Sequence, residues 1–182
     1  MEEKGFILWF TGLPGAGKTT IGRKVYEILK KNGYKVEMLD GDEVRKWLSP
    51  EAGFTKEDRE RHLRRVIYVS KLLVRNGVIV IATFVSPYRK IREEARKNID
   101  NFVEIFVKAS LDTVIKRDPK GLYKRALKGE IKNMTGIDDP YEEPLNPEVV
   151  IDTEKLTEEE SVKLVFDKLH ELGLIDKTKL KF

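Results

Sequence analysis

The chain has 182 residues, a length that favours a single domain with a core of its own. It contains no Cys, which excludes disulfides, thiolate metal ligands and a cysteine nucleophile. Its formal net charge of +4 is too small to indicate nucleic-acid binding by itself. The first apolar run, residues 6–11, is too short for a signal peptide or a membrane span, so we expect a soluble, cytoplasmic protein that uses no membrane. Abundant Lys and Glu together with the absence of Gln suggest a thermostable protein.

Short apolar segments alternate with longer amphipathic ones along the chain. In chain order we expect a strand at 6–11, a helix at 17–31, a strand at 35–40, a helix at 55–75, a strand at 78–85, a helix after Pro87, a strand at 102–109, a helix at 112–117, a strand at 149–153 and a helix after Thr157. The strand at 78–85 is the most apolar and is expected at the centre of the sheet. This alternation predicts an α/β fold of three layers, α/β/α, around a mostly parallel sheet, within one domain spanning residues 1–182.

One segment departs from the alternation. Residues 118–148 are rich in Pro, Gly and charged side chains and show no strand periodicity. A segment of this length inside a compact domain is typical of a mobile lid over a binding site, and we expect that role here.

The segment "GLPGAGKT" at residues 12–19 matches the P-loop pattern between a predicted strand and a predicted helix. Glycines let the backbone approach phosphates closely, and the helix N-terminus then faces the anion. Lys18 is expected to reach the β- and γ-phosphates, and the Thr19 hydroxyl to ligate Mg²⁺. The residues expected to bind ATP are Gly12, Leu13, Pro14, Gly15, Ala16, Gly17, Lys18, Thr19 and Thr20.

The P-loop predicts a nucleoside triphosphate and magnesium, but a GTPase, an ATPase motor and a small-molecule kinase all share it. A guanine-reading "NKxD" motif is missing from any suitable position, and the strand at 78–85 ends without an acidic residue. The chain is also short for a motor. The P-loop NTPase fold with a lid therefore favours a nucleotide or metabolite kinase.

Two acids in "LDGDEVR", Asp40 and Asp42, follow the second predicted strand. Ligands in open parallel sheets gather at the carboxyl ends of strands, so both carboxylates are expected at the cleft. Asp42 is the candidate to accept the proton of an attacking hydroxyl, with capping of a helix that starts at Glu43 as the alternative. Asp40, on a strand expected beside the P-loop strand, is a candidate to orient magnesium water or the P-loop, or a structural anchor.

Cations and a serine complete the candidate acceptor site. Arg45, Arg59 and His62 indicate an anionic acceptor, although a solvated helix face explains any one arginine equally well. Ser86 ends the strand at 78–85, where it is a candidate to bind substrate, accept phosphate or cap the next helix.

Several segments together resemble the adenylylsulfate kinase (APS kinase) family: "GLPGAGKTT", "LDGDEVR", "GFTKEDRERHLRR", "FVSPYRKIREEAR" and "KRDPKGLYKRALKGEIKNMTGIDDPYEEPLNPEVVIDT". They span residues 6–153. The resemblance implies transfer of the ATP γ-phosphate to the 3′-hydroxyl of adenosine 5′-phosphosulfate, with Mg²⁺, in a homodimer that acts in sulfate assimilation. Its rivals are another metabolite kinase on the same fold and a nucleotide-binding regulator that has lost transfer activity.

The resemblance also implies roles for individual residues. Lys18, Asp42 and Ser86 fall at catalytic positions, with Asp42 as the base and Ser86 at the position of a proposed phosphoserine. An in-line transfer aided by Asp42 needs no covalent step. Substrate-contacting positions are Asp40, Asp42, Arg45, Phe54, Arg59, His62, Val85, Ser86, Lys120, Leu122 and Met134, and Arg117 falls at an ATP-contacting position.

This chain departs from the family pattern at five positions. Pro14 and Ala16 stand where serines are common, and Pro14 has no N–H to offer a phosphate. Glu43 and His62 each replace an Asn. Met134 replaces a Phe, and a thioether cannot stack on a base as a ring does, so we expect looser adenine binding there.

Overall fold

The computed structural model describes residues 4–182, which fold around one five-stranded sheet. The strands are β1 (Ile7–Thr11), β2 (Val36–Asp40), β3 (Ile79–Thr83), β4 (Phe102–Lys108) and β5 (Val149–Asp152). Every neighbouring pair is parallel, and the order is β2-β3-β1-β4-β5. The expected α/β class is therefore confirmed.

The centre of the sheet is β1, so the expectation that the strand at 78–85 takes this place is wrong. Both β1 and β3 are buried along their whole length. An apolar sequence indicates that both faces of a strand are buried. Every interior strand of a sheet covered on both sides meets this condition, so apolarity does not tell which interior strand is the central one.

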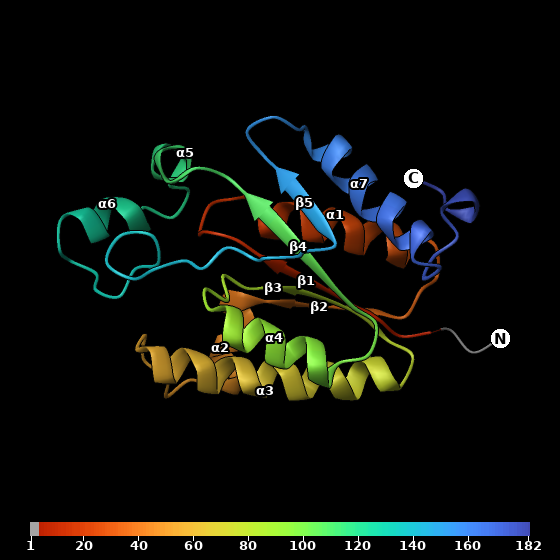
Figure 1. The fold of residues 1–182 in the computed structure, drawn as a ribbon, viewed down its shortest axis with the longest axis horizontal. Coiled ribbons are helices and arrows are strands. Elements are labelled where there is room, and N and C mark those ends of the chain that lie inside the picture. Colours follow the sequence, from red (N-terminus) through yellow and green to blue (C-terminus); the bar gives the residue numbers. More distant parts are fainter. Residues whose placement is uncertain (1–3) are drawn as a thin grey trace.

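Helices cover both faces of the sheet (Figure 1). One layer holds α1 (Lys18–Lys31) and α7 (Glu158–Glu171), and the other holds α3 (Lys56–Arg75) and α4 (Arg89–Asn98). Side chains alternate along β1, so Leu8 and Phe10 enter the core under α1 and α7 while Ile7 and Trp9 enter the other core. This three-layer arrangement places the carboxyl ends of all five strands at one end of the molecule.

Threonine hydroxyls cap the N-termini of α3 and α7. The Thr55 hydroxyl accepts from the backbone N–H of Asp58 at 3.2 Å, and the Thr157 hydroxyl accepts from that of Glu160 at 3.1 Å. The short helices are α2 (Gly41–Leu48), α5 (Leu111–Arg117), α6 (Leu122–Leu127) and the 3₁₀ turn η1 (Lys177–Lys179). No helix within residues 4–182 is long and apolar enough to cross a membrane.

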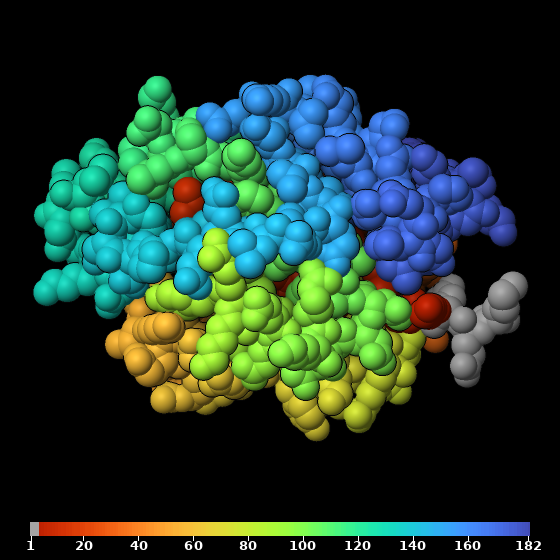
Figure 2. All heavy atoms as spheres, in the orientation of Figure 1, coloured from red at the N-terminus to blue at the C-terminus, as the bar shows by residue number. Residues whose placement is uncertain are grey.

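The lid segment, residues 118–148, contains α6 and otherwise irregular chain. It forms the left-hand end of the molecule in Figure 2, above α2 and α3. Its return to β5 is anchored on the start of α4: the N–H of Glu142 donates to Pro87 O at 2.8 Å, and buried Arg92 donates to Ser86 O at 2.5 Å and also to Glu142 O. These bonds fix the end of the segment beside the start of α4, and the role of the segment as a mobile lid remains a prediction.

Candidate active site

The P-loop turns between β1 and α1 through glycines that other residues could not replace. A Cβ at Gly12 would lie 2.3 Å from Val107 O, so only glycine lets the loop pass β4 this closely. Gly17, with φ of 113°, lies directly before Lys18, the first residue of α1. The expected cradle geometry of strand, tight turn and helix N-terminus is therefore present.

Lys18 lies across this loop. Its ammonium donates to the carbonyls of Gly12 and Leu13 at 2.8 and 2.9 Å. Burial lowers the pKa of Lys18 to about 7, and the charges of Asp40 and Asp42 only partly oppose this effect. A triphosphate at this position would supply the negative charge that the buried ammonium lacks.

Asp40 joins the P-loop helix to the sheet. Its Oδ1 accepts from the Thr19 hydroxyl at 2.9 Å and from the Thr83 hydroxyl at 2.6 Å. The expectation that β2 lies beside the P-loop strand is wrong, because β3 lies between them. Asp40 still contacts Thr19 of the P-loop helix, and Thr83 at the end of β3 donates to the same carboxylate oxygen. These hydroxyl and carboxylate oxygens are hard ligands of the kind Mg²⁺ prefers, so Thr19 and Asp40 fit a magnesium site.

Arg117, the last residue of α5, lies beside the P-loop, on the side of the site expected to bind the phosphate donor and called here the donor side. Its guanidinium donates to Gly15 O and Ala16 O at 3.4 and 3.3 Å, and to the Thr153 hydroxyl at 3.0 Å. Thr153 in turn donates to Ala16 O at 2.8 Å. Sequence reasoning missed Thr153, although its position at the end of the last predicted strand places it at the same edge of the sheet.

The lid segment contacts the P-loop through Tyr123, a second residue that sequence reasoning missed. Its hydroxyl donates to Pro14 O at 2.7 Å, and burial raises its pKa. Pro14 has no N–H, but its carbonyl accepts the hydrogen bond from Tyr123 of the lid segment. This departure from the family pattern therefore leaves a connection between lid and cradle intact.

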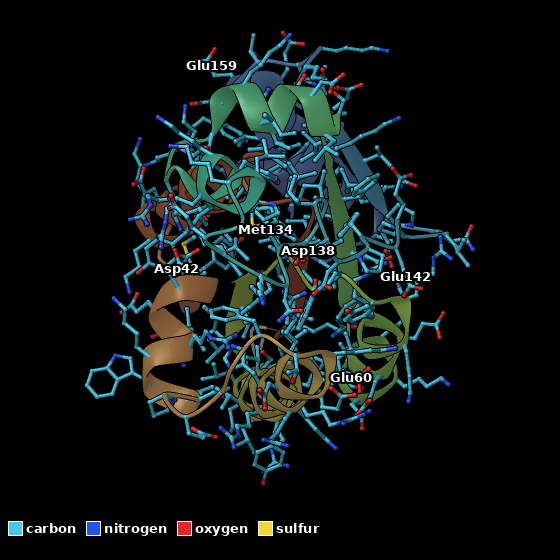
Figure 3. The ribbon with its side chains drawn as sticks, turned by 90° about the vertical axis from the view of Figure 1, so that its left-hand side faces the viewer. Asp42, Glu60, Met134, Asp138, Glu142 and Glu159 are labelled. Atoms are coloured by element: carbon cyan, nitrogen blue, oxygen red, sulfur yellow. The ribbon has the colours of Figure 1, made fainter. Side chains whose placement is uncertain are left out.

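Asp42 lies in the first turn of α2, which begins at Gly41. The alternative that it caps a helix starting at Glu43 is wrong, because Asp40 holds the N-cap position. The Asp42 carboxylate is exposed and pairs with the ammonium of Lys120 in the lid segment. Figure 3 looks onto the carboxyl ends of the strands and shows Asp42 at the tip of α2, facing the lid segment.

Arg45 holds the loop that follows α2. Its guanidinium donates to Ala52 O at 3.0 Å and also to Gly53 O, and it lies 4.4 Å from the centre of the Phe54 ring. Burial and the charge of Arg59 lower the pKa of Arg45. Phe54 is left 58% exposed, so one face of its ring is available to a ligand.

Arg59 is committed to the lid segment, so the alternative of a solvated helix face is wrong for this residue. It donates to the Thr135 hydroxyl at 3.2 Å and to Asn133 O, and pairs with Asp139 at 3.2 Å. Met134, which lies between Asn133 and Thr135 in the sequence, is buried in the core under α1 and α7, called here the main core. Leu122 also packs against that core.

His62 is buried at the inner side of α3, one turn from Arg59. Its Nδ1 lies 2.7 Å from the Ser49 hydroxyl. Burial and the positive charges of Arg45 and Arg65 lower the pKa of His62 to about 4. The imidazole is therefore neutral at physiological pH.

Ser86 is buried with φ of 41°, and its hydroxyl is engaged on both sides. It accepts from the Trp9 indole N–H at 3.0 Å and donates to Phe84 O at 3.2 Å. Helix α4 starts at Arg89 with Tyr88 as N-cap, so the capping alternative is wrong. Val85 O accepts from the Thr11 hydroxyl at 2.7 Å, which fixes the backbone beside Ser86.

The structure thus gathers the candidates into two groups at one end of the sheet. A hollow of about 840 Å³ lies between Leu13, the end of β4 and residues 136–143 of the lid segment. A second hollow of about 630 Å³ lies on the outer side of α3 and includes none of the candidate residues.

Comparison with known proteins identifies the family. The family model described as adenylylsulphate kinase matches residues 4–152. The chain belongs to the adenylylsulphate kinase family. An adenylyl-sulfate kinase of a Picosynechococcus species is 57% identical over 175 residues, which cover 96% of this chain and 99% of that protein.

Solved structures of this family have the same fold. A Mycobacterium tuberculosis APS kinase in complex with AMPPNP and APS superposes with a TM-score of 0.88 at 38% identity, covering 92% of this chain and 98% of that chain. A hexameric APS kinase from Thiobacillus denitrificans gives a TM-score of 0.74 at 35% identity, covering 96% of this chain and 30% of that chain. The resemblance found from the sequence motifs is therefore confirmed.

Proposed function

We propose that this adenylylsulphate kinase transfers the γ-phosphate of ATP to the 3′-hydroxyl of adenosine 5′-phosphosulfate (APS). The products are 3′-phosphoadenosine 5′-phosphosulfate and ADP, in sulfate assimilation. The observation that carries the proposal is the solved relative bound to both an ATP analogue and APS, which matches 92% of this chain. The P-loop turn and the Asp42 carboxylate, which lie at the same end of the sheet, support the proposal.

On the donor side, Lys18 and Arg117 hold the phosphates of ATP. Thr19, with Asp40 behind it, would hold Mg²⁺, which neutralises charge on the phosphates when bound. Thr20 and the remaining P-loop residues surround the nucleotide. Lys18 donates to loop carbonyls in this structure, so it exchanges those partners for phosphate oxygens when ATP binds.

On the acceptor side, Asp42 accepts the proton of the 3′-hydroxyl as that oxygen attacks the γ-phosphorus in line with the departing ADP oxygen. Lys120 must leave Asp42 for the hydroxyl to enter, and its charge is then free for the phosphates. Arg45, Arg59 and Phe54 bind the acceptor nucleotide, with the backbone of Val85 and Ser86 as its floor.

Ser86 has no carboxylate or imidazole partner within residues 4–182 that could act as its base. Its hydroxyl already donates to Phe84 O, and its proton would have to leave that bond. These contacts favour direct transfer aided by Asp42 over a phosphoserine, and Ser86 keeps a role in shaping the pocket.

A coupled assay for ADP with ATP, Mg²⁺ and APS tests the proposal. We expect ADP release that depends on APS and on the metal. A rate equal to the APS-free rate would leave a regulator or a different metabolite kinase, and a panel of other small hydroxyl acceptors would separate those two.

We also propose that the chain works as a cytoplasmic homodimer on small molecules, without nucleic acid or membrane. The family resemblance supports the dimer, while the hexameric relative makes a larger assembly the alternative. Light scattering on the purified chain is expected to give twice its mass of 21.1 kDa. A monomeric or hexameric mass would contradict the dimer.

A further inference from the structure

The buried hydroxyl of Ser49 lies between His62 and Arg65, and its hydrogen bonds decide which nitrogen of His62 carries a proton. Ser49 is 1% exposed, so its hydroxyl proton needs an acceptor within the protein. Two neighbours are within hydrogen-bond distance of its oxygen: His62 Nδ1 at 2.7 Å and Arg65 Nη1 at 2.9 Å. A guanidinium only donates, so the Arg65 contact occupies a lone pair of the Ser49 oxygen.

The Ser49 proton therefore goes to His62. Among the described residues, Nδ1 of His62 is the one acceptor in reach of this hydroxyl. A ring nitrogen that accepts a hydrogen bond carries no proton. Because Nδ1 accepts the bond from Ser49, the neutral ring must carry its proton on Nε2. Protonating the ring would leave the Ser49 hydroxyl without an acceptor and place a charge near Arg45 and Arg65, and Glu51 opposes this only weakly.

We propose that Ser49 and Arg65 are positioning residues that hold His62 as the neutral Nε2–H tautomer, so that it donates to an uncharged lone pair of the acceptor nucleotide. Nε2 of His62 has no hydrogen-bond partner among residues 4–182, although the ring is 4% exposed. Phe84 lies 6.0 Å from the imidazole between ring centres, and Arg45 next to His62 carries the Phe54 ring. Aromatic surroundings suit the adenine base better than the sulfate or phosphate, so a base lone pair is the expected acceptor.

This inference rests on the proposed function and explains a departure from the family pattern. An Asn side chain always presents N–H donors, whereas a neutral imidazole presents one on Nε2 only in the correct tautomer. The Ser49 and Arg65 pair supplies the control that Asn does not need. His62 can therefore replace the usual Asn without losing the donor.

The tautomer is measured first, on the unmodified chain. The chain contains two histidines, His62 and exposed His170, so a long-range ¹H–¹⁵N spectrum shows two imidazole rings. A His170→Gln variant assigns them. We expect at neutral pH an unprotonated Nδ1 and a protonated Nε2 for His62. A protonated Nδ1, in either a neutral or a charged ring, would overturn the proposal.

Kinetics then separate positioning from a merely structural role. Ser49→Ala is expected to raise KM for APS about three- to tenfold, because one hydrogen bond is lost, with kcat and KM for ATP unchanged. In a His62→Asn background the same substitution should change KM for APS by less than about twofold, because the amide needs no tautomer control. An equal rise in both backgrounds, or no rise in the unmodified background, would overturn the proposal.

Ser49→Cys covers the case in which the alanine variant fails to fold, since it leaves no cavity and keeps a weaker donor at the same position. It should give an intermediate KM for APS. Failure of the proposed function would be seen separately, as absence of APS-dependent ADP release by the unmodified chain, and the spectrum would still decide the tautomer.

Discussion

The donor and acceptor sides of the cleft are built in different ways. The donor side, which is the side of the P-loop, is formed mainly by backbone atoms. The carbonyls of Gly12, Leu13 and Ala16 accept hydrogen bonds from side chains in the P-loop helix and at the ends of nearby strands. The acceptor side is made of side chains from α2 and α3 that contact the lid segment, as Lys120 with Asp42 and Arg59 with Asp139 do. The lid segment contacts the donor side through the Tyr123 hydroxyl on Pro14 O, whereas it supplies charged partners to both Asp42 and Arg59 on the acceptor side. We therefore expect a movement of the lid segment to change the acceptor side more than the donor side.

The largest test of this contrast is Asp42→Ala. If Asp42 is the base, kcat is expected to fall about 10²- to 10⁴-fold while ATP affinity changes little, because among residues 4–182 the Asp42 side chain bonds to Lys120 and to no residue of the P-loop. The coupled assay gives kcat, and titration calorimetry gives ATP binding. Glu43→Ala is the matched control, since it removes the neighbouring exposed carboxylate from the same helix, and it should change kcat less than about twofold. Retained turnover in Asp42→Ala would leave Asp42 as a partner of Lys120 only.

Lys120→Ala tests whether the lid segment assembles the acceptor side. The Lys120–Asp42 pair is exposed, so its loss should barely change the melting temperature. The kcat/KM for APS is expected to fall about tenfold, equivalent to roughly 1.4 kcal/mol, because the lid cation no longer reaches the cleft. Lys124→Ala, an exposed lysine on α6, serves as the control. Equal effects of the two substitutions would mean that Lys120 acts only through general charge.

These two sides also differ in how far the sequence predicts them. The P-loop is a local pattern, so "GLPGAGKT" identifies the cradle, Lys18 and Thr19 without knowledge of the fold. Asp42 and Lys120 are 78 positions apart, and their contact depends on where the lid segment packs. Position along the chain was enough to make Asp42 and Ser86 candidates, but it left each arginine as possible surface. The family resemblance added the remaining residues of the acceptor side, among them Phe54 and Lys120.

Residues missed by sequence reasoning share one physical reason. Thr153, Tyr123 and Ser49 act on other site residues through hydroxyls, and Ser and Thr hydroxyls are common enough in any chain to carry no signal by themselves. The same holds for strand order: alternation predicts a parallel sheet, but the position of β3 between β1 and β2 is set by packing of the connecting helices. The sequence therefore predicts well the features that depend on neighbouring residues in the chain, and predicts poorly those that depend on long-range packing.

Thr153→Val probes the donor side by removing one hydroxyl at nearly constant volume. The Thr153 hydroxyl accepts from Arg117 and donates to Ala16 O, so its loss removes the side chain that links Arg117 to the P-loop and leaves only the long direct contacts of Arg117 with Gly15 O and Ala16 O. KM for ATP is expected to rise about three- to tenfold with KM for APS unchanged. Thr178→Val, in the 3₁₀ turn near the C-terminus, is a control. A change in KM for APS instead would show that the two sides are not separable.

Met134→Phe is the smallest expected change and concerns the acceptor side. A phenyl ring can stack on adenine where the thioether cannot, which is worth roughly 0.5–1.5 kcal/mol, so KM for APS should fall about two- to tenfold. Met134 is buried in the main core, so the larger ring should also lower the free energy of unfolding by about 1–3 kcal/mol. Steady-state kinetics and urea unfolding measure the two effects, and Met134→Leu controls for loss of the sulfur. An unchanged KM for APS would mean that Met134 serves the core and that the looser adenine binding expected from the sequence is wrong.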